Sequence, residues 1–363
     1  MSNVETRNKK ITSIISTFYT TVTNNKHRRH NADIDASIEK LFSTDTWGFR
    51  EVILVVAVGM KLDSKFRATK KFYDCNPRAI FEGPIKEFLI CHSLPHRKSG
   101  PLNIAKAAVG LDETWAAQRR PVDVATETVK LIRLMEKSPS MIDVVAESVI
   151  DHLIYETKSL EKLEVSLEPS SDPVFLYHVC QQLIDRVPDK GNTPQKISAC
   201  LLKAYHNSLG TNIVVTGGED SASVTSTTSK KPGDVNEESR NGEIFKVYEV
   251  TVKPFDLPRI RDSFDCVSIY NQTHTSTPVH EVIVICRPQD CPECMKESSL
   301  NEFMGEYKYK DIIYYFWNIY EWSASTLQRM TQKGRNMFHT SFNTYVNDIN
   351  TAKSVKELWS ELN

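Results

Sequence analysis

An Asn-Gly pair between two strand-like runs constrains the fold of this chain more than any other local feature. Asn241-Gly242 is typical of a two-residue type I′ turn, because both central residues of that turn need positive φ angles. A hairpin loop of fixed length also fixes the pairing of its strands, and here the numbers of paired residues add to 483. Asp234 is therefore expected directly opposite Glu249, with Cβ atoms about 4.5–5.5 Å apart.

This pairing brings two carboxylates together, and like charges at that distance repel unless a cation lies between them. Side chains alternate along a strand, so Glu249, Thr251 and Lys253 are expected on one face and Lys246 on the other. Two carboxylates beside a lysine suit a cation that prefers oxygen ligands, above all Mg²⁺. We expect Asp234 and Glu249 to bind this metal and Lys253 to assist an attacking water in phosphodiester hydrolysis.

The elements expected around the hairpin extend this hypothesis to a whole domain. Helices are expected over residues 192–209 and 256–271, a short buried strand over 212–216 and another apolar strand over 280–286. With the hairpin these give the order helix, three strands, helix, strand. The last strand is expected to return to the same sheet by a right-handed crossover. A solvated acid pair without a function is the alternative for the hairpin taken alone.

The order Asp234, hairpin, Glu249 and a lysine on the same face resembles the PD-(D/E)xK nuclease superfamily, which includes type II restriction endonucleases. The resemblance implies an α/β (α+β) nuclease core with αβββαβ order at residues 191–295. The superfamily places its lysine two residues after the second acid, where this chain has Thr251, so Lys253 would act as a substitute. It further implies Mg²⁺ as cofactor, double-stranded DNA as substrate, a homodimer and a cognate DNA methyltransferase in the same system.

Charge is distributed unevenly along the 363 residues. The net charge is −1 overall, but residues 1–120 carry 20 Lys and Arg against 12 Asp and Glu. Residues 1–190 are expected to be largely helical and to contact DNA phosphates, with a further basic run at 65–71. A solvated helix face is the alternative for each basic cluster taken alone. The candidate DNA-binding residues are Arg28, Arg29, His96, Arg97, Lys98, Arg119 and Arg120.

The C-terminal region, residues 296–363, is expected to be helical and to serve packing or dimerisation. It contains the aromatic-rich run 308–326, which at helical spacing indicates core or a subunit interface and alternatively a surface that stacks on bases. The longest apolar run, Val52–Met60, is far shorter than the ~18 residues of a membrane span. With no signal-peptide pattern at the start, a cytoplasmic protein without membrane contact is expected.

Three cysteines close together raise the possibility of a zinc site. Cys286, Cys291 and Cys294 supply three thiols, and a fourth ligand would have to be His280 at the far end of an apolar strand. Reduced thiols in a turn are the alternative that the spacing favours.

The sequence therefore predicts a Mg²⁺-dependent, sequence-specific double-stranded DNA endonuclease of the type II restriction class. One alternative is a structure-specific repair or recombination nuclease on the same core. Another is a DNA- or protein-binding module on a degenerate nuclease fold, and the absence of the usual lysine at position 251 is the feature that supports it best.

Overall fold

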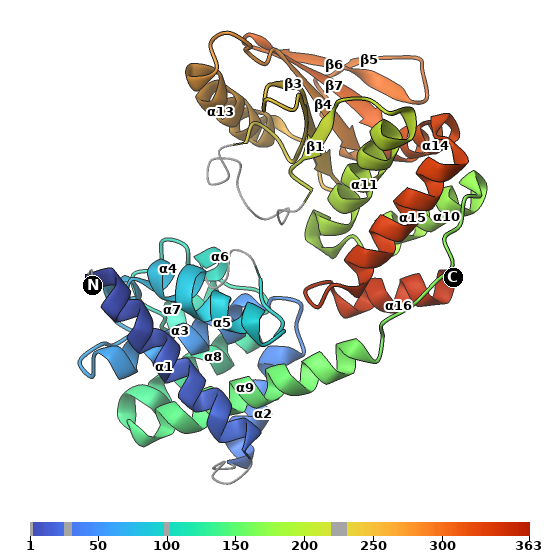
Figure 1. Ribbon diagram of the computed structural model, residues 1–363. Helices are drawn as coiled ribbons and strands as arrows, with labels where there is room; N and C mark the ends of the chain where they lie inside the picture. Colours follow the sequence, from blue (N-terminus) through green and yellow to red (C-terminus); the bar gives the residue numbers. More distant parts are fainter. Residues whose placement is uncertain (1–2, 25–30, 98–101, 219–230) are drawn as a thin grey trace. The chain divides into compact units, whose positions relative to one another are not determined.

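The computed structural model describes residues 3–24, 31–97, 102–218 and 231–363, and it divides into two compact units. Unit 1 spans Met1–Lys162 and unit 2 spans Leu163–Asn363 (Figure 1). Within the described ranges, no helix is both long enough and apolar enough to cross a membrane. The sequence predicts boundaries near residues 190 and 295, and in the structure the residues on both sides of each position belong to unit 2.

Unit 1 is helical in its described residues, and α3 forms its centre. All residues from Gly48 to Met60 are buried, because the helix is apolar on every side from Val52 to Met60 and is covered by its neighbours. The described helices of unit 1 are α1 (Asn3–Thr23), α2 (Ala32–Phe42), α3 (Gly48–Leu62), η1 (Phe72–Cys75), α4 (Pro77–Ile80), η2 (Phe81–Ile85), α5 (Lys86–Cys91), α6 (Leu102–Ala105), α7 (Glu113–Ala117), α8 (Val122–Lys137) and α9 (Ser140–Glu161).

Charged side chains are buried beside the start of α3. The Arg50 guanidinium donates to the Glu156 carboxylate at 2.7 Å and lies 4.0 Å from the ring centroid of Trp47. The neighbouring Glu51 is 2% exposed and accepts a hydrogen bond from the Arg97 backbone N–H at 2.6 Å. Burial raises the pKa of Glu51 to about 7, although the Arg97 hydrogen bond and the Arg50 charge both lower it.

Unit 2 is built on a mixed seven-stranded sheet with the strand order β1-β2-β3-β4-β7-β6-β5. β4 pairs in parallel with β3 and β7, and the other pairs are antiparallel. The mixed α/β class expected from the sequence is confirmed. The strands are β1 (Val214–Thr216), β2 (Val235–Glu238), β3 (Ile244–Thr251), β4 (Glu281–Cys286), β5 (Lys296–Glu297), β6 (Phe303–Tyr309) and β7 (Ile312–Asn318).

Helices cover both faces of this sheet and create two separate cores. α13 packs on one face through Ile260, Val267 and Tyr270, whereas α10, α11, α14, α15 and α16 contribute to the core on the other (Figure 1). The described helices of unit 2 are α10 (Pro173–Arg186), η3 (Asp189–Gly191), α11 (Asn192–Leu209), α13 (Leu257–Thr273), η4 (Pro288–Asp290), α14 (Ile319–Arg329), α15 (Gln332–Asn347) and α16 (Lys353–Leu362).

The loop between β2 and β3 is longer than the two-residue turn predicted from the sequence. The Ser239 N–H donates to the Glu243 carbonyl at 2.8 Å, so three residues, 240–242, form the loop. Gly242 has a φ of 82°, whereas Asn241 has no positive φ, and a type I′ turn would need one at both. The prediction of a type I′ turn is therefore wrong.

The predicted strand register is nevertheless correct beyond a β-bulge. Glu238 pairs with Ile244 and Glu237 pairs with Lys246, which leaves Phe245 as an extra residue on β3. This extra residue compensates for the extra loop residue. Paired residue numbers therefore add to 483 from Glu237 back to Val235, as the sequence predicted.

The expectation of an entirely helical region over residues 296–363 is wrong, because β5, β6 and β7 lie within it. In β7 the buried residues Ile312, Tyr314 and Phe316 alternate with partly exposed ones, which is the period of a strand. Aromatic and β-branched residues also favour strands, so the crowding of aromatic residues was not a helix signal. Helices resume at Ile319 with α14.

The buried Glu51 makes stability depend on pH. Its folded pKa of about 7 exceeds the ordinary 4.5, so its contribution is full below pH 4.5 and is lost as the pH rises through 7. The full shift corresponds to about 3 kcal/mol. We expect Glu51→Gln, which keeps an acceptor for Arg97, to exceed the natural protein in unfolding free energy above pH ~8 and to match it near pH ~4.5.

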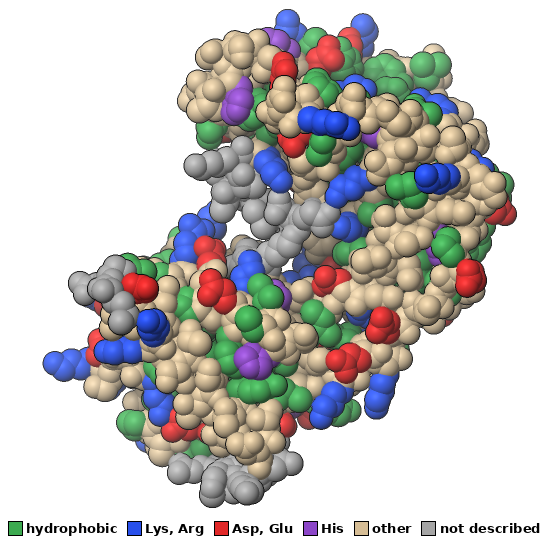
Figure 2. Space-filling view, in the orientation of Figure 1, with side chains coloured by type: hydrophobic (Ala, Val, Ile, Leu, Met, Phe, Trp, Pro, Cys, Tyr) green, Lys and Arg blue, Asp and Glu red, His purple; other side chains and the backbone are tan. Residues whose placement is uncertain are grey.

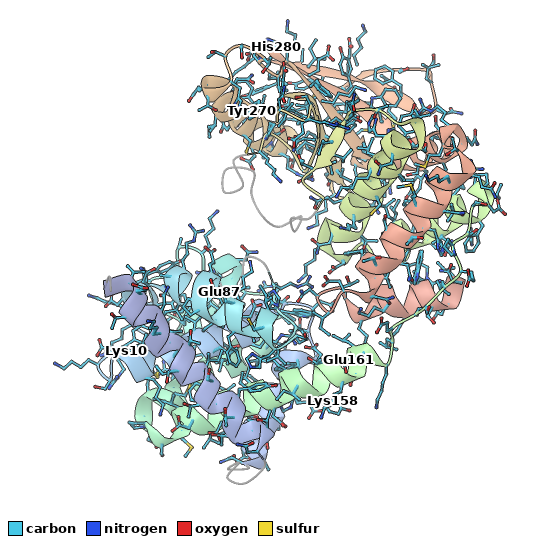
Figure 3. All side chains as sticks on the ribbon, in the orientation of Figure 1. Lys10, Glu87, Lys158, Glu161, Tyr270 and His280 are labelled. Atoms are coloured by element: carbon cyan, nitrogen blue, oxygen red, sulfur yellow. The ribbon has the colours of Figure 1, made fainter. Side chains whose placement is uncertain are left out.

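Denaturant unfolding at both pH values measures this difference. Glu87→Gln is the matched control, because Glu87 lies exposed on α5 (Figure 3). The same stability difference for Glu51→Gln at both pH values would contradict the assignment.

Candidate functional site

Asp234 and Glu249, here called the acid pair, lie next to each other as the hairpin register predicts. Asp234 precedes β2, and one further step of the observed register places it opposite Glu249. The side-chain interaction between the two acids lowers the pKa of Asp234 and raises that of Glu249. Asp234 Oδ2 also accepts the Val250 backbone N–H at 3.0 Å, and Glu249 Oε1 accepts the Ser263 hydroxyl at 3.0 Å. Strand, loop and α13 thus fix both carboxyl groups.

Burial raises the pKa of both acids. Glu249 is 6% exposed, and burial, followed by the negative charge of Asp234, raises its pKa to about 8. The Ser263 hydroxyl and the Arg259 charge oppose this rise. The pKa of Asp234 is also raised by burial, against the Val250 hydrogen bond and the Arg259 charge. At neutral pH the acid pair therefore holds a proton that a divalent cation could displace.

Two glycines allow the chain to carry Asp234 close to β3. A Cβ on Gly233 would lie 2.5 Å from the Val247 side chain, and one on Gly217 would lie 2.2 Å from the Asp234 carbonyl oxygen. Gln195 of α11 donates its Nε2–H to the same carbonyl at 3.2 Å. Among the described residues, Gln195 Oε1 is buried without a hydrogen-bond partner. The sequence did not indicate Gln195, because only the folded helix brings it to Asp234.

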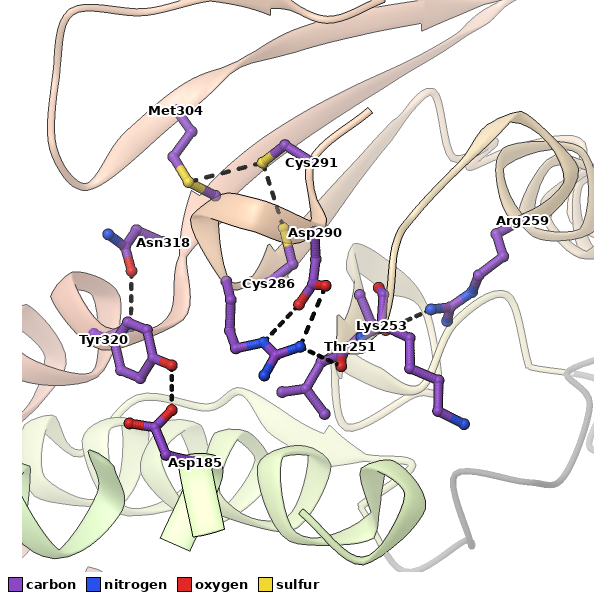
Figure 4. A network of polar contacts seen from close by, with 12 residues as sticks. Asp185, Thr251, Lys253, Arg259, Cys286, Asp290, Cys291, Met304, Asn318 and Tyr320 are labelled. Atoms are coloured by element: carbon purple, nitrogen blue, oxygen red, sulfur yellow. Dashed lines mark hydrogen bonds and ion pairs between the residues drawn. The ribbon is translucent and has the colours of Figure 1, made fainter. Parts of the chain in front are cut away.

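Thr251 and Lys253 occupy different environments, although both were expected beside Glu249. Thr251 is 3% exposed, and its hydroxyl accepts the Lys253 N–H at 3.1 Å and also a hydrogen bond from Arg259 Nη1 (Figure 4). β3 ends at Thr251, so the alternation of strand side chains does not extend to Lys253. The Lys253 side chain is exposed and extends away from the Thr251 hydroxyl in Figure 4.

Arg259 supplies the positive charge that acts on the acid pair. Its guanidinium lowers the pKa of both Asp234 and Glu249 and bonds to Thr251. Asp256 caps α13 by accepting the Arg259 N–H at 3.2 Å, so Arg259 lies in the first turn of the helix. The sequence signal for this placement is the short segment 252–256, which leads from the end of β3 into α13.

The donor set of the acid pair fits Mg²⁺. Across the part of the chain that the structure describes, no three His, Cys, Asp or Glu side chains gather as a metal site. Two carboxylates alone match Mg²⁺, which keeps several waters and takes oxygens from a substrate phosphate. Asp234 and Glu249 would hold the ion.

The three clustered cysteines do not form a zinc site with His280. Cys286 and Cys291 lie 3.7 Å apart at their sulfurs, but Cys294 is exposed and all three are free. His280 precedes β4 and Cys286 ends it, so the strand separates them by ~20 Å. Figure 3 shows His280 at the start of this strand.

The candidate DNA-binding residues around position 97 are only partly described. Arg28, Arg29 and Lys98 lie outside the described residues. His96 is 8% exposed, and Arg97 is half-buried with its guanidinium 4.4 Å from the Trp47 ring centroid. These two side chains therefore contribute to the packing of unit 1.

The other two candidates lie just before α8. Arg119 is half-buried, whereas Arg120 is exposed and donates to the backbone carbonyls of Ala117 and Arg119 at 3.1 and 2.8 Å. Arg120 is thus the more accessible of the two. The face of unit 1 seen in Figure 2 carries Lys and Arg side chains scattered among Asp and Glu.

A cavity of about 680 Å³ in unit 1 is lined by more cations than anions. The basic run 65–71 provides most of its positive charge, and the Arg7 guanidinium donates to the Cys75 carbonyl at its side. Its charged lining residues are Arg7, Asp63, Lys65, Arg67, Lys70, Lys71 and Asp74. The excess of positive charge suits phosphate groups.

No model of a known protein family matches this sequence, and no curated protein matches it significantly. The chemistry of the chain therefore has to be inferred from its own residues.

Metal binding to the acid pair predicts a pH-dependent thermal stabilisation. Mg²⁺ must displace the proton held by Glu249, so it should raise the melting temperature more at pH ~8.5 than at pH ~6.5. At saturating metal and the higher pH we expect a rise of about 2–4 °C or more. Asp234→Asn should abolish the response, and the exposed Asp262→Asn on α13 should retain it. Equal responses of both variants would remove the acid pair from the metal site.

Proposed function

We propose that unit 2 hydrolyses phosphodiester bonds of double-stranded DNA as a Mg²⁺-dependent, sequence-specific endonuclease of the type II restriction class. The observation that carries the proposal is the acid pair, two fixed carboxyl groups with raised pKa values beside an arginine. The element order around it, α11, β1, β2, β3, α13 and β4, supports the resemblance to the PD-(D/E)xK superfamily.

The contacts of the acid pair prepare its two carboxyl groups for metal binding. Mg²⁺, when bound, would stabilise negative charge at phosphorus and acidify a water. Val250 and Ser263 each occupy one oxygen of the acid pair, which orients the remaining lone pairs toward the cation. Because each carboxyl is held by the backbone or by a buried hydroxyl, little reorganisation is needed when the metal binds.

Arg259 takes the charge-neutralising role that the superfamily gives to its lysine. Thr251 stands at the lysine position and accepts a hydrogen bond from Arg259, so the guanidinium is held where that ammonium would act. Arginine stays protonated in proteins, so Arg259 can orient the water or neutralise charge but cannot act as a base. Lys253, exposed beyond the end of β3, is available to a DNA phosphate.

Unit 1 supplies DNA contacts in this proposal. Its basic cavity, with Lys65, Lys70 and Lys71 exposed around it, offers several cations to phosphates. Two active sites related by a twofold axis are needed to cut both strands of a symmetric sequence, so the protein would act as a homodimer in the cytoplasm beside a protective DNA methyltransferase.

Cleavage of plasmid DNA tests this function directly. The natural protein with Mg²⁺ should give discrete fragments, and Asp234→Asn or Glu249→Gln should each cut at least about 100-fold more slowly. Both variants should retain DNA affinity, since the substitutions remove a metal ligand rather than basic surface. The control Glu243→Gln, at an exposed position directly after the loop of the same hairpin, should cut normally.

Other outcomes distinguish the remaining functions. If the protein cleaves only branched or mismatched DNA, it is a structure-specific repair nuclease and not a restriction enzyme. DNA binding without cleavage under any divalent cation would identify a non-catalytic module on the same fold.

A second prediction distinguishes the role of Arg259 from that of Lys253. Arg259→Ala should lose at least about 100-fold in cleavage rate, because it removes the charge that acts on both acids. Lys253→Ala should change the cleavage rate by less than about tenfold and mainly weaken DNA binding. Rates at saturating DNA separate these effects, and Arg261→Ala, exposed on α13, is the control. If Lys253→Ala fails to cleave DNA and Arg259→Ala cleaves it normally, Lys253 and not Arg259 is the cation of the active site.

A further inference from the structure

The face of the sheet opposite the acid pair holds a second polar cluster, centred on Glu237. This residue is 3% exposed, and its Oε1 accepts the Tyr248 hydroxyl at 2.9 Å and lies 3.0 Å from His206 Nε2. Lys246 Nζ lies 3.8 Å from the other carboxylate oxygen, Oε2. Strand alternation turns Glu237 toward α11, whereas the acid pair faces α13. The cluster is therefore separate from the proposed active site.

The Glu237 cluster lines a cavity of about 210 Å³, here called the Glu237 cavity. Lys246 and Arg329 line it with side chains that are 56% and 58% exposed, so they connect it with solvent. The volume is below the ~300–1,000 Å³ of sites for drug-sized ligands, so it suits a single flat ring system. Its remaining walls are mainly apolar and aromatic: Leu202, Tyr205, Ile283, Trp317, Trp322 and Thr326.

One hydrogen-bonding group of the Glu237 cavity has no partner among the residues that the structure describes. Trp317 lines the cavity, and its indole N–H is buried without an acceptor. An indole can only donate, so a ligand that accepts this hydrogen bond would satisfy it. On the acceptor side, the only contact of Glu237 Oε2 within the described part of the chain is that with Lys246 Nζ, at 3.8 Å. The groups that line the cavity are therefore complementary to an aromatic ligand that presents N–H donors beside a carbonyl oxygen.

We propose that the Glu237 cavity binds a guanine base. Guanine presents two N–H donors next to its O6 acceptor on one edge, which matches Glu237 together with the donors Trp317 and Lys246. Adenine would place a ring-nitrogen acceptor against the Glu237 carboxylate, and the pyrimidines offer fewer adjacent N–H donors. The exposed Lys246 and Arg329 suit the phosphate attached to such a base.

A second cavity adjoins the first and suits a neighbouring base of the same strand. It has a volume of about 480 Å³ and shares Lys246, Ile283 and Trp317 with the Glu237 cavity. Phe303 contributes a ring 5.6 Å from that of Trp317 and 6.2 Å from that of Tyr315. Aromatic surfaces of this kind stack on unpaired bases regardless of sequence. The inference does not rest on nuclease activity and holds for a purely DNA-binding protein as well.

Calorimetric titration of the full chain tests the guanine site. The probes are dGMP, dAMP, and short oligothymidylates that carry one guanine or one adenine. We expect guanine probes to bind about tenfold or more tightly than their adenine counterparts. Trp317→Phe, which keeps a ring but removes the N–H, should weaken guanine binding about fivefold. Glu237→Gln should remove the preference for guanine, and Glu243→Gln, exposed directly after the loop of the same hairpin, should bind normally.

The arms of the experiment also identify the source of the base and guard against a folding defect. Tight binding of dGMP assigns a free nucleotide, and binding of the oligonucleotide alone assigns a base within a strand, and either supports the site. Trp317→Phe keeps the test valid if the more buried Glu237→Gln does not fold. The site is ruled out if no guanine probe binds, if adenine binds equally, or if Trp317→Phe leaves guanine affinity unchanged. Asp234→Asn, inactive by the nuclease proposal, should bind guanine normally.

Discussion

The register between β2 and β3 is the constraint on which both candidate sites depend. A shift of one residue would move every side chain of β3 to the opposite face of the sheet. The register is set by two irregularities that cancel, the three-residue loop and the bulge at Phe245. Because of this cancellation, Glu249 meets Asp234 on the α13 face, while Lys246 meets Glu237 on the α11 face.

The acid pair is costly for the folded protein, and the surrounding contacts limit that cost. Two carboxyl groups are held together with little access to water, which raises the pKa of each. A backbone N–H, the Ser263 hydroxyl and the Arg259 guanidinium lower those pKa values without cancelling the rise. Groups that are destabilised in this way mark functional sites more often than structural ones, although the buried Glu51 shows that packing alone can produce the same shift.

The sequence was most informative where local rules decide the structure. Helix starts such as Pro173 and Asp256, and the apolar strand β4, follow from capping residues and alternation. The loop length was mispredicted because the residue that compensates for it, Phe245, lies beyond the turn. Strands β6 and β7 were missed because aromatic crowding suits helix and strand alike.

The long-range parts of the candidate site were beyond the reach of sequence patterns. Arg259 and Gln195 reach the acid pair only after helices α13 and α11 pack against the sheet. Lys253 was assigned by extending strand alternation past Thr251, where β3 in fact ends. No periodicity in the sequence marks that end, since it is set by the turn that Thr251 makes with Lys253.

The strand order has a consequence for how the chain is assembled during synthesis. β7 pairs directly with β4, although β5 and β6 lie between the two strands in the sequence and are synthesised before β7. Until β7 has joined the sheet, one edge of the apolar strand β4 lacks a partner and is a template for unwanted pairing with other chains. Unit 1 has its own core and is complete well before this stage. The docking of β7 therefore closes an edge of β4 that would otherwise be open to other chains.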